Sequence, residues 1–470
     1  MVQDIFKLMK PELLLVLLLF ILLFWKLAKN EGTTATQLAV INVLLIGNFI
    51  AGFFLNSEGS VFSEVYKAST LATTEKNILN FGVCLISMQS YSWLKTHKHV
   101  LEFYMLLVST LIGFFLMISG QNLLLFYLGL ELATIPLAAL CNFDLEKRKS
   151  SEAAMKLIMS SAFSSALLLF GISLVYGTTG SINFTELSLA LNGNPLQLFA
   201  FVLLIAGFAF KISAVPFHLW TADVYEGSPV AVTSYLSVIS KGAIIFVFAT
   251  VLYTVFKPLA TTWYNLLFLI SVLTMLVGNL FAIRQNNMKR FLAFSSIAQV
   301  GFILIGISGS SEMGTASVVF FVLVYIFSNL GAFGVVSVVS AITGKENMSD
   351  YSGFYTSNKL LSWVLVLSLF SLAGIPPTAG FFGKFFLLMA GAGKGNYVLI
   401  IIAALNMIVS LFYYLKVVRT IFMEKNEAPM EKLAIDNWPK LAMAICITGI
   451  IALGFVSWIY EYINGIVSGI

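Results

Sequence analysis

The chain is 470 residues long, and 59% of these residues are hydrophobic while only 10% carry a charge. A typical soluble domain is about half apolar and about a quarter charged, so this composition excludes an ordinary soluble protein and predicts an all-α polytopic membrane protein. The net charge of +5 is modest and does not indicate nucleic-acid binding.

The N-terminal run and the cysteines show no sign of processing or of metal binding. Lys7 and Lys10 precede the first apolar run, but no small-residue cleavage site follows it, so we expect a retained first helix. Cys84, Cys141 and Cys446 lie far apart in apolar stretches, without a CxxC pair or a Cys/His cluster. We therefore expect no zinc or iron–sulfur site and no redox chemistry in this chain.

Apolar runs long enough to cross a bilayer occur about fourteen times. They cover residues 11–28, 37–56, 77–94, 100–119, 121–142, 153–177, 196–218, 228–256, 262–283, 291–308, 314–342, 360–392, 396–422 and 439–465. The third run is weak because it carries Gln89 and Ser90, and the twelfth is long and interrupted. The connections between the runs are too short to form a soluble domain.

The distribution of basic residues predicts the orientation. If the N-terminus lies outside, 17 of the 27 lysines and arginines fall in inside loops, 6 in outside loops and 4 within helices. Positive residues favour the cytoplasmic side, so we expect both termini to face away from the cytoplasm.

Five charged residues are expected inside membrane spans. They are Glu131, Lys156, Lys211, Lys241 and Lys384. An ionised side chain at bilayer depth costs at least ~2.5–3.5 kcal/mol, so such residues normally line a polar path and serve function. The sequence therefore predicts a protein that moves charge across a membrane.

The seventh helix is predicted to break after Lys211. His218 lies seven residues further on, and Pro216 between them removes a backbone donor. Broken helices at membrane depth line polar cavities, so Lys211 and His218 together indicate a hydrated proton path. A solvated histidine at a helix end is the alternative interpretation of His218.

A second break interrupts the twelfth helix at Gly374, Pro376, Pro377 and Gly380, and Lys384 follows it. Two interrupted helices in separate halves of the chain predict two inverted five-helix repeats. The predicted parts are an N-terminal three-helix segment (1–99), a first repeat with helices 4–8 (100–256), a second repeat with helices 9–13 (257–425) and a C-terminal helix 14 (426–470).

Glu131 is expected to pair with a cation of a neighbouring helix, and Lys156 is the candidate by order along the chain. Separation of such a pair would change the proton affinity of the lysine. The alternative for Lys156 is an exposed pair with Glu152, four residues earlier. Lys241 lies about thirteen residues into its span, too deep to reach the interface by snorkelling.

Two stretches of the chain resemble a known family. FKISAVPFHLWTADVYEGSP and GNLFAIRQNNMKRFLAFSSIAQVGF resemble signatures of the antiporter-like subunits of respiratory complex I, which are relatives of Mrp-type sodium/proton antiporter subunits. The resemblance is clearest over residues 100–425. SLAGIPPTAGFFGKFF is similar to the branch of the family whose twelfth helix carries lysine, here Lys384, where another branch carries glutamate.

The resemblance implies a proton-translocating subunit and assigns roles to matched positions. These are the modulating pair Glu131 and Lys156, the central carrier Lys211 with the histidine His218, the relay Lys241 and the exit lysine Lys384. It implies a translocase subunit without a cofactor of its own, in the bacterial inner membrane. NADH, FMN, iron–sulfur clusters and quinone would be bound by partner subunits.

The implied partners are neighbouring antiporter-like and small membrane subunits and, indirectly, the NADH-oxidising arm. Two alternatives remain open at this point. The first is a subunit of a Mrp-type cation/proton antiporter or of a membrane-bound hydrogenase, which share the fold and the intramembrane lysines. The second is an assembly scaffold, in which buried charges only hold helices together.

Overall fold

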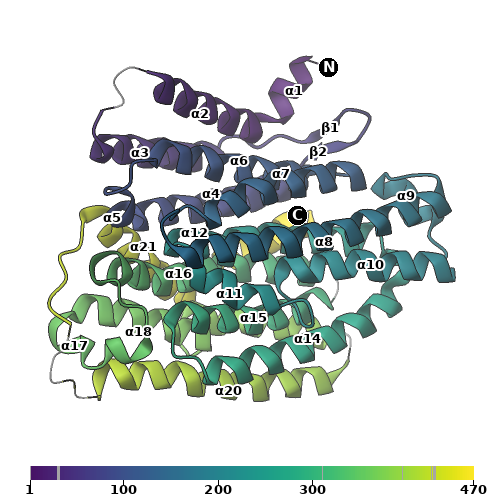
Figure 1. The fold of residues 1–470 in the computed structure, drawn as a ribbon. Helices are drawn as coiled ribbons and strands as arrows, with labels where there is room; N and C mark the ends of the chain where they lie inside the picture. The colour runs from purple at the N-terminus through teal and green to yellow at the C-terminus, as the bar shows by residue number, and fades with distance from the viewer. Residues whose placement is uncertain are drawn as a thin grey trace.

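The structure is a computed structural model that describes residues 2–28, 32–309, 311–393, 395–424, 426 and 430–469. Lys29, Lys394 and Lys425, which contributed to the predicted orientation, lie outside these residues. The helices run side by side along one direction, with α5 and α17 at one end of the bundle and the β1–β2 hairpin and α9 at the other (Figure 1).

The elements follow the chain in four groups. The N-terminal segment holds α1 (Val2–Leu8), α2 (Lys10–Leu27), α3 (Thr34–Gly52), β1 (Gly59–Val61), β2 (Tyr66–Ala68), α4 (Thr70–Gln89) and α5 (Tyr91–Leu94). The next group holds α6 (Val100–Ser119), α7 (Leu123–Cys141), α8 (Arg148–Thr179), α9 (Phe184–Ala190), α10 (Pro195–Ile212), α11 (Leu219–Gly227), α12 (Val230–Tyr235), the π-helical turn η1 (Leu236–Ser240) and α13 (Lys241–Thr254).

The third group holds the short helix η2 (Lys257–Leu259), α14 (Ala260–Ile283), α15 (Met288–Ile307), α16 (Ser311–Thr343), η3 (Met348–Tyr351), α17 (Phe354–Ser357), α18 (Lys359–Ala373), α19 (Ala379–Ala392) and α20 (Tyr397–Phe422). The chain ends with α21 (Asn437–Phe455) and α22 (Trp458–Ser468). The β1–β2 hairpin pairs antiparallel, with Ser60 opposite Lys67.

The described residues form 11 helical segments that are long and apolar enough to cross a membrane. The helix α2, the more polar helix α4 and the interrupted pair α18–α19 add the other three spans of the predicted fourteen. The all-α polytopic class is therefore confirmed, and the chain is a multi-pass membrane protein.

Three predicted boundaries were wrong. The seventh run was extended to His218, but α10 ends at Ile212 and α11 is a separate helix. The last run was extended to residue 465, but α21 ends at Phe455 and the amphipathic α22 follows. The third run was started at residue 77, whereas Ser69 accepts a hydrogen bond from the Ala72 amide and starts α4 at Thr70.

Both predicted breaks are present and share a backbone pattern. The residue that ends α10 is Ser213, with φ 66°, and the residue that ends α18 is Gly374, with φ 85°. Both lie in the left-handed region that terminates helices. A proline follows three residues later in each case, Pro216 and Pro377, so neither helix can continue.

A second matching pattern supports the inverted repeats. The side chains of Asn122 and Asn287 accept backbone hydrogen bonds at the starts of α7 and α15. Each asparagine also forms a bridge with an asparagine after the following long helix, Asn183 or Asn347. The first bridge lies beside the β1–β2 hairpin and the second at the opposite end of the bundle, beside α5. The boundaries 1–99, 100–256, 257–425 and 426–470 stay a prediction.

The centre of the bundle is formed by the last span of the second group (α12, η1 and α13) together with α15 and α16, whose side chains are almost all buried. Peripheral helices expose an apolar face instead, as Leu269 of α14 and Phe412 of α20 show. This outer apolar face is the surface that lipid or neighbouring membrane helices would cover.

Candidate functional site

Three of the predicted lysines lie deep inside the bundle. The exposed fractions of Lys211, Lys241 and Lys384 are 7%, 2% and 1%. Snorkelling to an interface is therefore excluded for all three. Each Nζ instead donates hydrogen bonds to protein oxygens, which keeps a buried ammonium or amine satisfied.

Lys211 belongs to a polar layer between α7, α8 and α10. Its Nζ donates to Ser161 Oγ (2.6 Å) and to Thr134 Oγ1 (3.2 Å). One turn away in this layer, Ser165 Oγ donates to the Glu131 carboxylate (2.5 Å). Thr134, which binds Lys211, lies one turn from Glu131 on α7. Ser161, which also binds Lys211, lies one turn from Ser165 on α8. Glu131 and the Lys211 ammonium are therefore about one helical turn apart along the bundle.

The expected pairing of Glu131 with Lys156 is wrong. Lys156 Nζ contacts Glu152 Oε1 and Asp223 Oδ2, each at 2.7 Å, and its side chain is 41% exposed. Ser165, which binds Glu131, lies nine residues further along α8 than Lys156, about 14 Å away at 1.5 Å per residue. The exposed pair with Glu152 is therefore present, and the contact with Asp223 was missed.

Asp223 links Lys156 to a charged network at the end of α11. Arg290 Nη1 contacts Asp223 Oδ1 (2.6 Å) and Glu226 Oε2 (3.0 Å), and Lys149 Nζ contacts Glu226 Oε1 (3.0 Å). The acidic residues of TADVYEG could have indicated from the sequence that a charged network lies here. No sequence rule, however, predicts which basic residues contact Asp223 and Glu226.

Lys241 is the first residue of α13, directly after the π-helical turn η1. Its Nζ donates to Ser296 Oγ (2.6 Å) and lies 5.4 Å from the centroid of the Tyr225 ring. Ser296 is nine residues after the capping residue Asn287, as Glu131 is nine residues after Asn122. Ser296 thus occupies in the second repeat the place that a glutamate has in the first.

Lys384 caps the first half of the second broken helix. Its Nζ donates to the carbonyls of Leu372 (2.7 Å) and Ala373 (3.3 Å), and it lies 4.7 Å from the Phe302 ring centroid. The last carbonyls of a helix have no partner within the helix, and Lys384 supplies a donor to two of them. Gln299 Nε2 donates to the same Leu372 carbonyl (3.0 Å).

Lys241 and Lys384 are joined through α15. Ser296, which binds Lys241, and Gln299, which shares an acceptor with Lys384, lie one turn apart on this helix. A small cavity of about 10 Å³ is lined by Lys241, Ser296, Gln299 and Tyr325, and this volume holds about one water molecule. Lys241, Ser296, Gln299 and Lys384 therefore form a row of neighbouring polar groups in the second half.

His218 is placed at the start of α11 and is 8% exposed, so a solvated helix end is excluded. The residues that the structure describes contain no group of three or more His, Cys, Asp or Glu that could hold a metal ion. Of the six predicted site residues, five lie buried or half-buried in the bundle, and Lys156 lies in the exposed network.

A buried ion pair in the N-terminal segment was missed. Lys76 is one of the six basic residues that the sequence predicted in outside loops, but its Nζ contacts Glu12 Oε1 (2.5 Å) and Ser119 Oγ (2.6 Å) inside the bundle. Tyr66 donates to the other Glu12 oxygen (2.9 Å). The pair ties α2 to α4 and α6, and only the N-cap at Ser69 could have shown that α4 begins before Lys76.

Lys76→Met is expected to destabilise the protein. Removal of one partner of a buried pair leaves Glu12 uncompensated and costs about 3–5 kcal/mol. The melting temperature of the purified protein measures this loss. Lys67→Met, at an exposed lysine of the β1–β2 hairpin, is the control and should leave the melting temperature unchanged. Equal melting temperatures for the two variants would contradict the prediction.

Two interrupted helices, with buried lysines joined by hydroxyl and amide side chains, define a class of multi-pass membrane proteins built to carry ions along their interior. Residues 120–410 match the family described as NADH:quinone oxidoreductase/Mrp antiporter, TM. The chain belongs to this family.

The similar proteins agree with the assignment. The chain is 44% identical to NADH-quinone oxidoreductase subunit N of Azobacteroides pseudotrichonymphae, over 99% of this chain and 98% of the relative. It is 45% identical to the subunit N of Phocaeicola vulgatus over 87% of each chain. The branch of the family that was predicted from Lys384 and its surroundings is confirmed by these relatives, and it is that of subunit N.

Solved structures share the fold. A chain of respiratory complex I from Thermus thermophilus with bound aureothin superposes with a TM-score of 0.80 at 25% identity, over 94% of this chain and 96% of that chain. A chain of the Mrp complex from Dietzia superposes with a TM-score of 0.84 at 18% identity, over 99% and 96%. The second likeness concerns the fold alone.

Proposed function

We propose that this chain is the subunit N of a bacterial NADH:quinone oxidoreductase and moves protons through its buried charged residues. One observation carries the proposal: three buried lysines and a glutamate lie within the bundle, and each is bound to a hydroxyl or a carbonyl group. The names of the relatives support the coupling to NADH oxidation on other subunits.

Each buried group has a separate task in this mechanism. Lys211 takes up and releases a proton, and the Glu131 carboxylate lies one helical turn away in the same polar layer. Lys241 passes the proton through Ser296 and Gln299. Lys384 receives it at the second break and delivers it to the other side or to a neighbouring subunit.

The membrane arrangement is part of the proposal. The chain lies in the bacterial inner membrane with the lysine- and arginine-rich end of the bundle in the cytoplasm and both termini outside. Its partners are other membrane subunits of the assembly, and the NADH-oxidising subunits act on it indirectly. NADH, FMN, the iron–sulfur clusters and quinone bind to those partner subunits.

Recovery of the chain with its partners tests the assignment. A tagged copy is extracted gently from its own membranes, and the proteins that accompany it are identified by mass spectrometry. We expect NADH-oxidising and iron–sulfur subunits. Recovery with only Mrp-type antiporter subunits, or with hydrogenase subunits, would overturn the respiratory assignment while leaving the ion path intact.

Glu131→Gln is expected to lower NADH-driven proton pumping by a larger factor than Lys156→Met. The half-buried carboxylate of Glu131 lies in the polar layer of Lys211, whereas the side chains of Lys156 and Glu152 are 41% and 59% exposed, and exposed pairs contribute little. Pumping is measured in inside-out membrane vesicles, with NADH oxidation recorded in parallel. A larger loss in Lys156→Met would reinstate a direct role for that lysine.

A further inference from the structure

A groove at the end of the bundle that carries α5 and α17 is lined by three lysines (Figure 1). It lies between the start of α18 and the segment that leads into α21, and its volume is about 590 Å³. The three lysines are Lys359, Lys432 and Lys440, and all of them are exposed. Among the residues that the structure describes, no acidic side chain lines the groove and none of the three lysines forms an ion pair. We call this feature the lysine groove.

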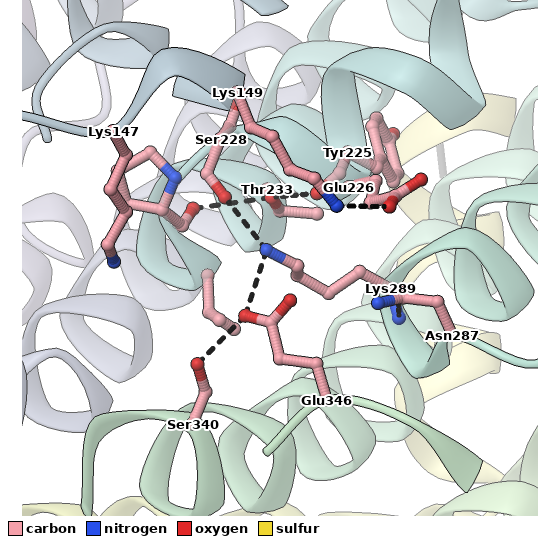
Figure 2. Close-up of polar contacts among 12 residues, drawn as sticks. Lys147, Lys149, Tyr225, Glu226, Ser228, Thr233, Asn287, Lys289, Ser340 and Glu346 are labelled. Carbon is pink, nitrogen blue, oxygen red and sulfur yellow. Dashed lines mark hydrogen bonds and ion pairs between the residues drawn. The ribbon is translucent and has the colours of Figure 1, made fainter. Parts of the chain in front are cut away.

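A second cavity at the same end of the bundle, beside α5, is built differently. Its volume is about 350 Å³. Its charged lining forms three ion pairs, which are Lys147 with Asp144 (2.8 Å), Lys149 with Glu226 (3.0 Å) and Lys289 with Glu346 (3.0 Å). Figure 2 shows the last two of these pairs. The charges of that cavity compensate one another, whereas the lysine groove carries three uncompensated positive charges.

Hydrogen bonds hold the two walls of the lysine groove together. Asn358, the residue before α18, donates through Nδ2 to the Glu431 carbonyl (3.0 Å) and accepts through Oδ1 from the Leu433 amide (2.9 Å). Asn358 is buried, so these hydrogen bonds are shielded from water. The backbone of Lys432, between the two bound residues, is therefore fixed beside the start of α18.

Two of the three lysines occupy positions that do not suit a cation. Lys359 is the first residue of α18 and Lys440 is the fourth residue of α21, and neither helix has a side-chain cap at its start. The start of a helix carries partial positive charge and free backbone N–H groups, so a lysine is unfavourable there and an anion is favourable. Helix stability does not explain these lysines, and a bound anion would offset the charge of both.

An apolar surface continues from the lysine groove along α18. Leu360 lines the groove and is 51% exposed, and Trp363, one turn further along the helix, is 48% exposed. The Trp363 ring lies 6.5 Å from the Tyr355 ring, which is itself 6.0 Å from Lys359 Nζ. Tryptophan and tyrosine favour the interface between membrane and water, so the three lysines lie at the level of the lipid headgroups. A free phosphate ion would leave this apolar surface uncovered.

We propose that the lysine groove binds a phospholipid with a negatively charged headgroup. The three lysines of the groove contact the headgroup phosphate, and Leu360 and Trp363 contact the upper part of an acyl chain. A phospholipid is the ligand that combines an anion with an apolar chain, and basic pockets between membrane helices are typical sites for such headgroups. The bound lipid links the start of α18 to the start of α21. The site is independent of the proposed proton path.

Photolabelling of the whole assembly tests the site. The purified assembly is placed in phosphatidylcholine nanodiscs that contain a small fraction of phosphatidylglycerol with a photoreactive group on one acyl chain. We expect labelled peptides from the start of α18, including residues 359–363. Unlabelled phosphatidylglycerol should compete with this labelling, whereas inorganic phosphate at constant ionic strength should not. Competition by inorganic phosphate, or no competition by phosphatidylglycerol, would overturn the proposal.

A triple variant tests the three lysines together, with Lys359→Gln, Lys432→Gln and Lys440→Gln. A basic residue beside an anionic lipid strengthens binding by roughly fivefold, so we expect the apparent affinity for phosphatidylglycerol to fall by about a hundredfold. The corresponding triple arginine variant should keep the affinity, because arginine retains the positive charge. Loss of labelling in the arginine variant would contradict recognition by charge.

A second triple variant, with Lys98→Gln, Arg148→Gln and Lys345→Gln, is the matched control. It removes the same number of positive charges from exposed positions outside the lysine groove. We expect it to keep the labelling of α18. Phosphatidylglycerol should also raise the melting temperature of this control but not that of the groove variant. Equal loss of labelling in both glutamine variants would indicate only general attraction to a positive surface and would overturn the site.

Discussion

Lys211→Met is expected to abolish NADH-driven proton pumping while the assembly remains intact. Methionine fills the volume of lysine but has no titratable group, and a positioned proton carrier contributes about a hundredfold or more to a proton-transfer step. Lys211 is buried and bound to Ser161 and Thr134, and methionine at this position can bind neither hydroxyl nor a proton. Pumping is measured in inside-out vesicles, with the amount of assembled complex determined on native gels.

Lys211→Arg separates proton exchange from a purely electrostatic role. Arginine keeps the positive charge and the donors but stays protonated in proteins. We therefore expect Lys211→Arg to pump as poorly as Lys211→Met. Recovery of pumping with arginine would show that the charge alone matters. Lys257→Met, at an exposed lysine of the short helix η2, is the control and should pump normally.

Lys384→Gln is expected to lower pumping about as strongly as Lys211→Met and with little loss of stability. Glutamine still donates a hydrogen bond towards the Leu372 and Ala373 carbonyls, but it cannot carry a proton. The measurement is the ratio of protons pumped to NADH oxidised, together with the melting temperature.

Lys384→Met is the companion variant. It removes both the proton carrier and the donor, so the C-terminal carbonyls of α18 lose a partner at a cost of about 1–3 kcal/mol. Its melting temperature should therefore fall below that of Lys384→Gln. If Lys384→Gln pumped normally, Lys384 would be a helix cap and the proton would leave elsewhere.

The breaks of the two central helices could be read directly from the sequence. Pro216 and Pro377 act on the backbone of their own segment, so their effect does not depend on distant residues. The burial of Lys211, Lys241 and Lys384 was predicted for a similar reason, since each lies far from the ends of an apolar run. Such local features allowed the fold class and most of the candidate path to be predicted.

The partners of the charged groups could not be predicted. Order along the chain favoured Lys156 as the partner of Glu131, but nine residues of helix separate Lys156 from Ser165, which binds Glu131. The match between Glu131 and Ser296 was equally hidden, because it becomes visible only once the capping residues Asn122 and Asn287 align the two halves.

By itself, the sequence determined that the chain is a multi-pass helical membrane protein with two interrupted helices and lysines at bilayer depth. Lipid forms no hydrogen bonds with the backbone and does not solvate charged side chains. Both constraints act on residues that are consecutive in the chain, so they can be recognised from the sequence. The tertiary structure alone decided the buried Lys76–Glu12 pair, the contact of Lys156 with Asp223 and the row of polar groups from Lys241 to Lys384. Each depends on what a distant segment places, or fails to place, within hydrogen-bond distance.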